Sequence, residues 1–168
     1  MKIKNFIAAF IVVFAINNGL AQNKKFKMHT VAFYNVENLF DTINDPDTYD
    51  EEYTPVNGWT KKNYEKKLDN LSRVLIELGT SDMQKNAPVI IGVCEVENRR
   101  VLEDLVKHPR LLDKNYKVVH FDSPDKRGID VGFLYQERHF QPTSYINVPL
   151  YVYQNEVTTT KKSKKNSD

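Results

Sequence analysis

An unbroken apolar run, Pro-Val-Ile-Ile-Gly-Val-Cys at residues 88–94, most constrains how this chain can fold. A strand that is apolar throughout is typical of a sheet covered on both faces. The run therefore predicts a buried strand in a layered domain. It ends on Cys94, the only cysteine of the chain, for which we expect a buried structural thiol rather than a reactive one.

Three more segments read as strands because they are rich in β-branched and aromatic residues. They are residues 29–36, 116–121 and 129–135, the last with its apolar side chains on one face. Residues 140–153 contain one or two weaker strands interrupted by prolines.

Two segments between the strands have helical spacing. After Thr60, a possible N-cap, the apolar positions are Tyr64, Leu68, Leu71, Leu75 and Leu78, and Gly79 is placed to end the helix. A second helix begins at the cap residue Asn98 and runs to Lys107. The order strand, helix, strand, helix, strand, strand predicts an α/β or α+β sandwich.

The first 21 residues have the pattern of a signal peptide. Lys2 and Lys4 precede an apolar stretch at residues 6–16, and the small residues Gly19 and Ala21 follow it. A membrane span needs about 20 apolar residues, so this stretch is too short for one. A buried core helix is the weaker reading because Asn-Asn-Gly interrupts the pattern. We expect an exported protein, periplasmic or extracellular, with no stable membrane anchor once residues 1–21 are removed.

The formal net charge of +2 belongs to the ends of the chain. Loss of Lys2 and Lys4 leaves a mature charge of zero. The Lys-rich residues 154–168 carry +2, so residues 22–153 carry about −2. We expect this segment to be a disordered tail or a truncated loop, and residues 22–153 to form the domain. A near-neutral chain gives no strong electrostatic signature of nucleic-acid binding.

The candidate chemistry lies where the apolar strand ends, at Glu95, Glu97 and Asn98. Ligands of open sheets gather outside the carboxyl ends of strands. A carboxylate there suits Mg²⁺ (or Mn²⁺), and Glu95 is our candidate metal ligand. Glu95 and Glu97 are two residues apart, so in an extended strand both side chains face one way. The alternative is that Glu95 is a helix cap or a surface charge.

Two further segments carry polar residues of the same kind. Asn35 ends the first strand, and its amide suits the support of a metal-bound carboxylate or of a phosphate oxygen, although turn chemistry is the alternative. Arg127 offers a forked donor that matches phosphate, beside Gly128, which permits close approach. The alternative is a solvated turn in which Asp130 holds Arg127.

Three motifs together resemble the endonuclease/exonuclease/phosphatase superfamily, which includes deoxyribonuclease I and exonuclease III-like nucleases. They are Phe-Tyr-Asn-Val-Glu-Asn at residues 33–38, Val-Cys-Glu-Val-Glu-Asn at 93–98 and Arg-Gly-Ile-Asp-Val at 127–131, and the resemblance covers residues 28–151. It implies a four-layer α/β sandwich that hydrolyses phosphodiesters or phosphomonoesters, nucleic acids among them, with Mg²⁺ or Mn²⁺. Glu95 matches the metal-binding glutamate, Asn35 the supporting asparagine and, more loosely, Arg127 a substrate contact. The roles of Glu97, Asn38 and Asp130 stay open.

The family carries a general-base motif Asp-x-Asn and a Ser-Asp-His motif in its second half. In this sequence no Ser-Asp-His occurs, and the one Asp-x-Asn triplet, at residues 113–115, precedes the strand at 116–121 and does not follow the last predicted strands. We therefore expect residues 22–153 to be the N-terminal half of the fold, inactive alone, either truncated or completed by another polypeptide that supplies the C-terminal half. The alternative function is a non-catalytic exported binding module built on the same half-fold.

Overall fold

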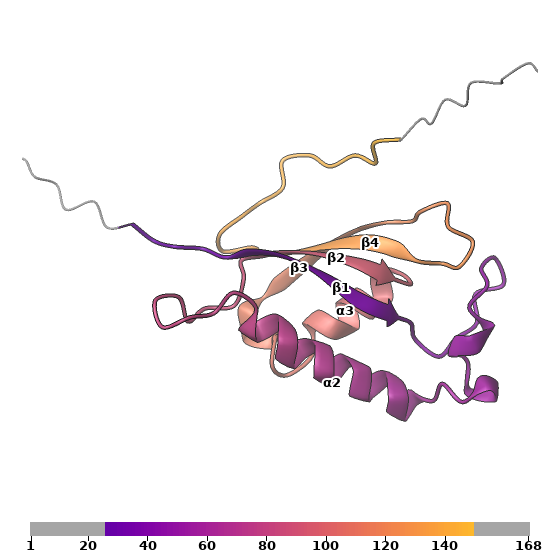
Figure 1. Ribbon diagram of the computed structural model, residues 1–168. Helices are drawn as coiled ribbons and strands as arrows, with labels where there is room; N and C mark the ends of the chain where they lie inside the picture. The colour runs from indigo at the N-terminus through magenta and orange to yellow at the C-terminus, as the bar shows by residue number, and fades with distance from the viewer. Residues whose placement is uncertain (1–25, 150–168) are drawn as a thin grey trace, which may run out of the picture.

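Residues 26–149, the described part of the chain, form a four-stranded sheet with two α-helices against one of its faces (Figure 1). A computed structural model describes residues 26–149. In chain order the elements are β1 (Val31–Leu39), the short 3-10 helices η1 (Glu51–Tyr53) and η2 (Pro55–Asn57), α2 (Lys61–Glu77), β2 (Ile90–Val96), α3 (Arg99–Val106), the 3-10 helix η3 (Leu112–Lys114), β3 (Tyr116–Phe121) and β4 (Asp130–Gln136). The proposed signal peptide and the Lys-rich tail lie outside the described residues.

The sheet has mixed strand directions, in the order β1-β2-β4-β3. β1 and β2 are parallel neighbours, and α2 lies in the crossover between them, as parallel pairing requires. β4 is antiparallel to both β2 and β3. The predicted α/β class is therefore confirmed in the form of a small domain with one mixed sheet and two helices.

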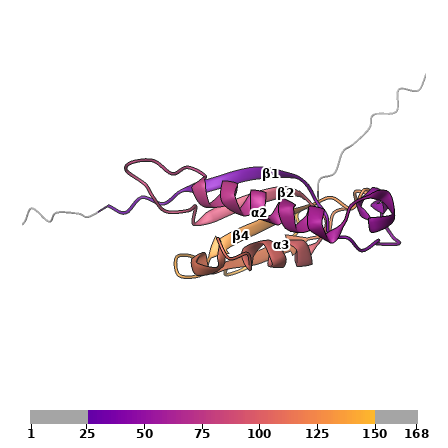
Figure 2. The same cartoon turned by 90° about the horizontal axis from the view of Figure 1, so that it is seen from below.

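The core lies between the helices and one face of the sheet. Figure 2 shows α2 and α3 from the side on which they cover the sheet. The predicted stripe of α2 is buried there through Tyr64, Leu68, Leu71 and Leu75. From the sheet, alternate residues such as Ile91, Val93 and Leu134 point into the same core and are fully buried. Apolar side chains repeat every 3.6 residues along the helix and every second residue along the strands. Both sets pack into one apolar layer.

The two helices begin in different ways. Asn98 is the N-cap of α3, and its side chain accepts a hydrogen bond from the backbone N–H of Val101 at 3.1 Å, as expected. Thr60 occupies the N-cap position of α2, but its side chain makes no capping hydrogen bond; its hydroxyl contacts the side-chain oxygen of Asn63 instead. Gly79 follows the end of α2 with a φ of 64°, the left-handed geometry that favours glycine.

Within residues 26–149, the second face of the sheet has no covering layer. Val31 and Phe33 of β1 are 67% and 70% exposed, and Val131 and Phe133 of β4 are exposed beside them. The expectation that β2 is covered on both faces is wrong for this part of the chain. The apolar face predicted for β4 is this uncovered one, whereas the residues that β4 buries are Asp130, Gly132, Leu134 and Gln136.

The segment after β4 differs from the prediction. Residues 140–149 contain no strand, and residues 150–153 lie outside the described part. The segment carries Pro142 and Pro149, which cannot donate to a ladder, and its contact with the sheet includes the ring of Tyr145, 5.8 Å edge-on from that of Phe121. Between residues 26 and 149 neither helix combines the length and the apolar character of a membrane span.

Candidate active site

The carboxyl ends of the parallel strands β1 and β2 bring two predicted site residues together. Asn35 is in register with Cys94, so the next residue of β2, Glu95, lies at the same edge of the sheet. The side-chain amide of Asn35 donates to Oε1 of Glu95 at 2.8 Å. Two motifs 60 residues apart in the chain thus form one polar pair.

Irregular backbone at both strand ends aims these side chains. Glu95 has a φ of 63°, and the pairing of β2 with β4 shifts register between Cys94 and Val96. β1 shows the same features at Glu37 and Asn38, with φ values of 54° and 62°. Non-glycine residues in this region cost about 1 kcal/mol or more each, and such bulges commonly re-aim a side chain near functional sites.

The bulge also separates the two glutamates that were expected to face one way. Glu95 pairs with Asn35, whereas Oε2 of Glu97 accepts a hydrogen bond from the backbone N–H of Asp41 at 2.7 Å. The expectation assumed an extended chain through Glu95, and the left-handed conformation there breaks the alternation. Glu97 therefore contacts Asp41 and is not part of the Asn35–Glu95 pair.

The Asn35–Glu95 pair has the donor chemistry of a divalent cation site. The amide oxygen of Asn35 accepts from the N–H of Glu37 at 2.7 Å, which fixes the amide with its NH₂ toward Glu95. Among the described residues, Oε2 of Glu95 makes no hydrogen bond, and the residue is only partly buried. One oriented carboxylate beside solvent fits Mg²⁺, which takes one or two protein oxygens and completes its shell with water and phosphate.

Sequence reasoning missed an aromatic residue, Tyr53, on which the charge of Glu95 acts. The ring of Tyr53 stacks on that of Phe40 at 4.0 Å, and Trp59 meets it edge-on at 5.7 Å. Burial raises the pKa of Tyr53, and the charges of Glu52 and Glu95 raise it further. The Tyr53 phenol therefore stays protonated at neutral pH. Its only signal in the sequence is an aromatic residue in an acidic loop.

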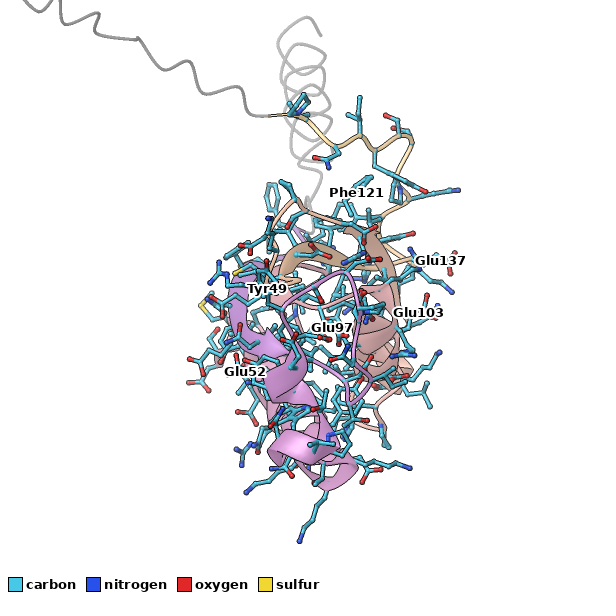
Figure 3. All side chains as sticks on the ribbon, turned by 90° about the vertical axis from the view of Figure 1, so that its right-hand side faces the viewer. Tyr49, Glu52, Glu97, Glu103, Phe121 and Glu137 are labelled. Atoms are coloured by element: carbon cyan, nitrogen blue, oxygen red, sulfur yellow. The ribbon has the colours of Figure 1, made fainter. Side chains whose placement is uncertain are left out.

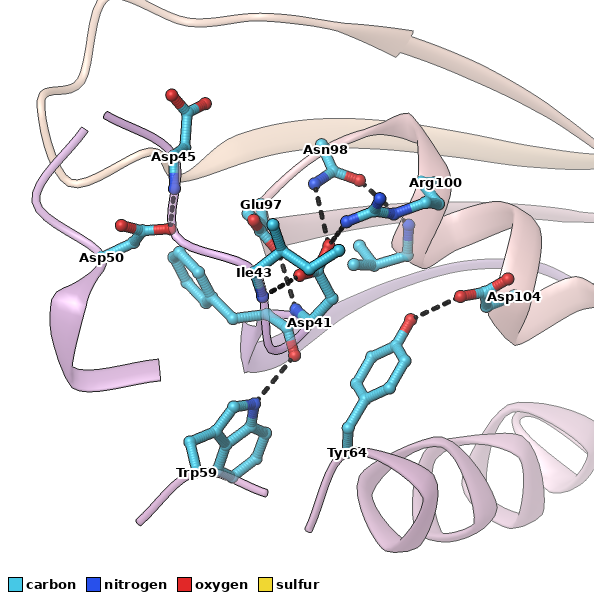
Figure 4. Close-up of polar contacts among 12 residues, drawn as sticks. Asp41, Ile43, Asp45, Asp50, Trp59, Tyr64, Glu97, Asn98, Arg100 and Asp104 are labelled. Atoms are coloured by element: carbon cyan, nitrogen blue, oxygen red, sulfur yellow. Dashed lines mark hydrogen bonds and ion pairs between the residues drawn. The ribbon is translucent and has the colours of Figure 1, made fainter. Parts of the chain in front are cut away.

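The loop that carries Tyr53 is anchored by buried carboxylates (Figure 4). Asp41 is 6% exposed and forms an ion pair with Arg100, while its N–H binds Glu97. Burial raises the pKa of Glu97 to about 7 despite that hydrogen bond, and the charge of Asp41 contributes. Figure 3 looks at this end of the molecule, with Glu97 near its centre and the loop residue Tyr49 on one side.

The third motif meets the same loop. The backbone N–H of Tyr49 donates to the carbonyl of Lys126 at 2.8 Å, and Gly128, with a φ of 68°, packs against Thr48. The exposed guanidinium of Arg127 binds both oxygens of Asp125, at 3.1 and 2.7 Å. Asp125, and not Asp130 as the alternative reading had it, holds Arg127. Asp130 lies beside His120 instead.

The fold and this site define a small mixed α/β domain whose parallel strands end in a carboxylate and its supporting amide. A model of the Endonuclease/Exonuclease/phosphatase family matches residues 30–165, and the chain belongs to this family. The resemblance inferred from the three motifs is thereby confirmed. Neither the curated proteins nor the solved structures contain a match to the chain.

Proposed function

We propose that this protein is the metal-binding half of an exported phosphoesterase that cleaves phosphodiester bonds with Mg²⁺ or Mn²⁺. The observation that carries the proposal is the hydrogen bond from Asn35 to Glu95 at the ends of two parallel strands. Family membership supports phosphoester hydrolysis as the reaction class. The pattern of residues 1–21 supports export.

Each predicted site residue has a role that its contacts allow. Glu95 holds the cation through its available carboxylate oxygen, and Asn35 keeps that carboxylate in place. The bound cation supplies charge neutralisation at the phosphoryl and leaving oxygens. Arg127 lies in an exposed turn, where it binds a phosphate oxygen with the donors that Asp125 leaves available.

We further propose that a C-terminal half completes the four-layer sandwich. Two observations support this: no Asp-x-Asn triplet follows β4 and no Ser-Asp-His motif for proton transfer occurs in the sequence, and the sheet of residues 26–149 exposes apolar side chains such as Phe33 on one face. Proton-transfer groups contribute about 10²–10⁴-fold to such reactions. The 168-residue chain alone is therefore expected to be inactive.

The metal assignment is tested on the 168-residue chain by titration with Mn²⁺, followed by electron paramagnetic resonance. We expect one Mn²⁺ that Mg²⁺ displaces, lost in Glu95→Gln and kept in Glu97→Gln. The second variant is the matched control because Glu97 is of the same residue type two positions away and is hydrogen-bonded to Asp41. Retention of the Mg²⁺-displaceable ion in Glu95→Gln would overturn the assignment.

The reaction is tested by joining this chain to the half of a family member that carries the two missing motifs. We expect hydrolysis of bis(p-nitrophenyl) phosphate or DNA with Mg²⁺, abolished by Glu95→Ala. Turnover by the purified 168-residue chain would contradict the proposed incompleteness. A joined, folded protein that binds its complement and hydrolyses neither substrate would favour the binding-module alternative.

A further inference from the structure

We propose that His120, Asp122 and Asp130 form a second cation site, which binds a transition-metal ion such as Zn²⁺ and fastens the turn that carries Arg127. His120 lies near the end of β3, Asp130 begins β4, and Asp122 lies in the connection between them. One ligand atom from each residue lies within 4.8 Å of those from the other two. Ion binding by these three residues does not require the proposed hydrolytic function, although the turn that it fastens carries the proposed substrate contact Arg127.

The site lies on the opposite face of the sheet from Asn35. His120 follows the alternation of Tyr116 and Val118, which face the helix-covered core. Asn35 follows the alternation of Val31 and Phe33, which are exposed on the uncovered face. The His120 group and the Asn35–Glu95 pair are therefore two separate sites near one end of the sheet.

The main argument is a buried imidazole nitrogen without a hydrogen bond. The side chains of His120 and Asp130 are 5% and 6% exposed, and Nε2 of His120 lies 3.0 Å from Oδ2 of Asp130. Nevertheless Nε2 makes no hydrogen bond, because an N–H there does not point at an acceptor. Burial of a polar atom without a partner is unfavourable, so Nε2 of His120 is available to an additional ligand.

The spacing suits two ligands of one ion. Nitrogen and oxygen atoms that bind a first-row ion at about 2.0–2.2 Å lie about 3.0–3.5 Å apart. The other oxygen of Asp130, Oδ1, accepts from the N–H of Ser123 at 2.7 Å, so Oδ2 is the one that faces the imidazole. A ligating carboxylate held in this way by a neighbouring N–H is typical of metal sites.

Asp122 is the candidate third ligand from the solvent side, since one of its carboxylate oxygens belongs to the group of ligand atoms within 4.8 Å of one another. Its side chain is 92% exposed and lies 3.7 Å from Nδ1, the other nitrogen of the His120 ring, so it would turn toward Nε2 to reach an ion bound there. His120 and Asp122 also line a surface hollow together with Asp45 and Glu97, which leaves room for an ion and its waters. Arg100 lines the same hollow, but it is paired with Asp41.

The donor set defines the class of ion. One imidazole with two carboxylates suits Zn²⁺, Co²⁺ or Mn²⁺, whereas Mg²⁺ prefers oxygen ligands alone. Two of the ligands flank residues 123–129, so a bound ion closes this turn at its base. Arg127 would then lie on a turn that the ion holds in place.

The test is a Co²⁺ titration of the 168-residue chain, followed by visible absorption and by calorimetry with Zn²⁺. We expect one Co²⁺ with d–d bands, displaced by Zn²⁺ and bound at least about tenfold more weakly in Asp122→Asn. His120→Gln should lose it. Asp122 is exposed, so its variant tests the site even where His120→Gln fails to fold.

Two controls separate this site from others. His139→Gln removes a member of a close pair of imidazoles, His29 and His139, whose rings are 4.6 Å apart. Glu95→Gln removes the proposed Mg²⁺ ligand. Both variants should keep the Co²⁺ bands. Wild-type protein without the bands, or Asp122→Asn with unchanged affinity, would overturn the proposal, as would bands lost only in His139→Gln.

Discussion

The side-chain amide of Asn35 donates to Oε1 of Glu95 at 2.8 Å, across 60 residues of sequence. The bond joins the ends of two parallel strands whose backbones both leave regular geometry at this point. A carboxylate oriented by an amide differs from a free one, because it is already aimed before a cation arrives. This hydrogen bond therefore gives a physical basis for the family resemblance of the segments 33–38 and 93–98.

Removal of the Asn35 amide should weaken cation binding without abolishing it. We expect Asn35→Ala to lower the affinity for Mg²⁺-displaceable Mn²⁺ by about 10–100-fold, since Glu95 keeps its charge but loses its orientation. Paramagnetic resonance titration measures the effect. The control is Asn63→Ala, an exposed asparagine in α2. Equal affinities in the two variants would show that Asn35 does not position the ligand.

Glu97 should make the protein less stable as the pH rises. Its pKa is raised from 4.5 to about 7, so the folded state keeps a proton that the unfolded state releases between these values. Stability from this group is complete below pH 4.5 and is lost as the pH rises through 7. A shift of this size would correspond to about 3 kcal/mol, and partial solvent screening reduces our expectation to about 1–2 kcal/mol.

Glu97→Gln tests this sign, because the glutamine amide resembles the protonated carboxyl group. Urea unfolding should give the variant and the wild type similar stability at pH 4.5, and a variant about 1–2 kcal/mol more stable at pH 8. The difference between the two proteins isolates Glu97 from other titrating groups. A variant that is equally stable at pH 4.5 and less stable at pH 8 would contradict the assignment.

Two glycines of the sheet should respond differently to alanine. A Cβ on Gly132 would collide with the buried side chain of Leu102 and lie 3.1 Å from Val93, so Gly132→Ala should cost about 1–3 kcal/mol. A Cβ on Gly92 would meet Phe33 at 2.7 Å, but that ring is 70% exposed and can turn away. Gly92→Ala should therefore stay within about 0.5 kcal/mol of wild type in thermal unfolding. A reversed order would contradict the close contact of Leu102, in α3, with Gly132.

The helix caps provide a second matched pair. Asn98→Ala removes the side-chain acceptor for the N–H of Val101 and should destabilise the protein by about 1 kcal/mol. Thr60→Ala alters the same cap position in α2, where the side chain makes no capping hydrogen bond, and should cost less. Chemical denaturation of both variants measures the difference. A Thr60 variant as destabilised as the Asn98 variant would show that the side chain of Thr60 does cap its helix.

Local patterns predicted much of this fold. The bounds of β3 agree with the predicted residues 116–121, and α2 buries the predicted stripe. The cap at Asn98 was also predicted, because an asparagine before an apolar helical pattern needs only its own neighbourhood to form the bond. These features depend on residues within a few positions of one another.

The predictions that were wrong concern irregular backbone and contacts between residues that are distant in the sequence. The sequence pattern of an apolar strand face is the same whether or not another layer covers it. The sequence therefore did not predict that one side of β2 and β4 is uncovered. The left-handed conformation of Glu95 has no sequence signal, because glutamate rarely adopts it. The pairing of Asp130 with His120 rather than Arg127 follows from the register of β3 with β4.

The strand order has a consequence for how this site assembles in time. β3 and β4 are joined by a short connection and form a local antiparallel pair, whereas β1 meets β2 only after the whole α2 crossover has closed. Contacts between distant parts of a chain form more slowly than local ones. We therefore expect the Arg127 turn to be in place early in folding, and Asn35 to reach Glu95 among the last steps.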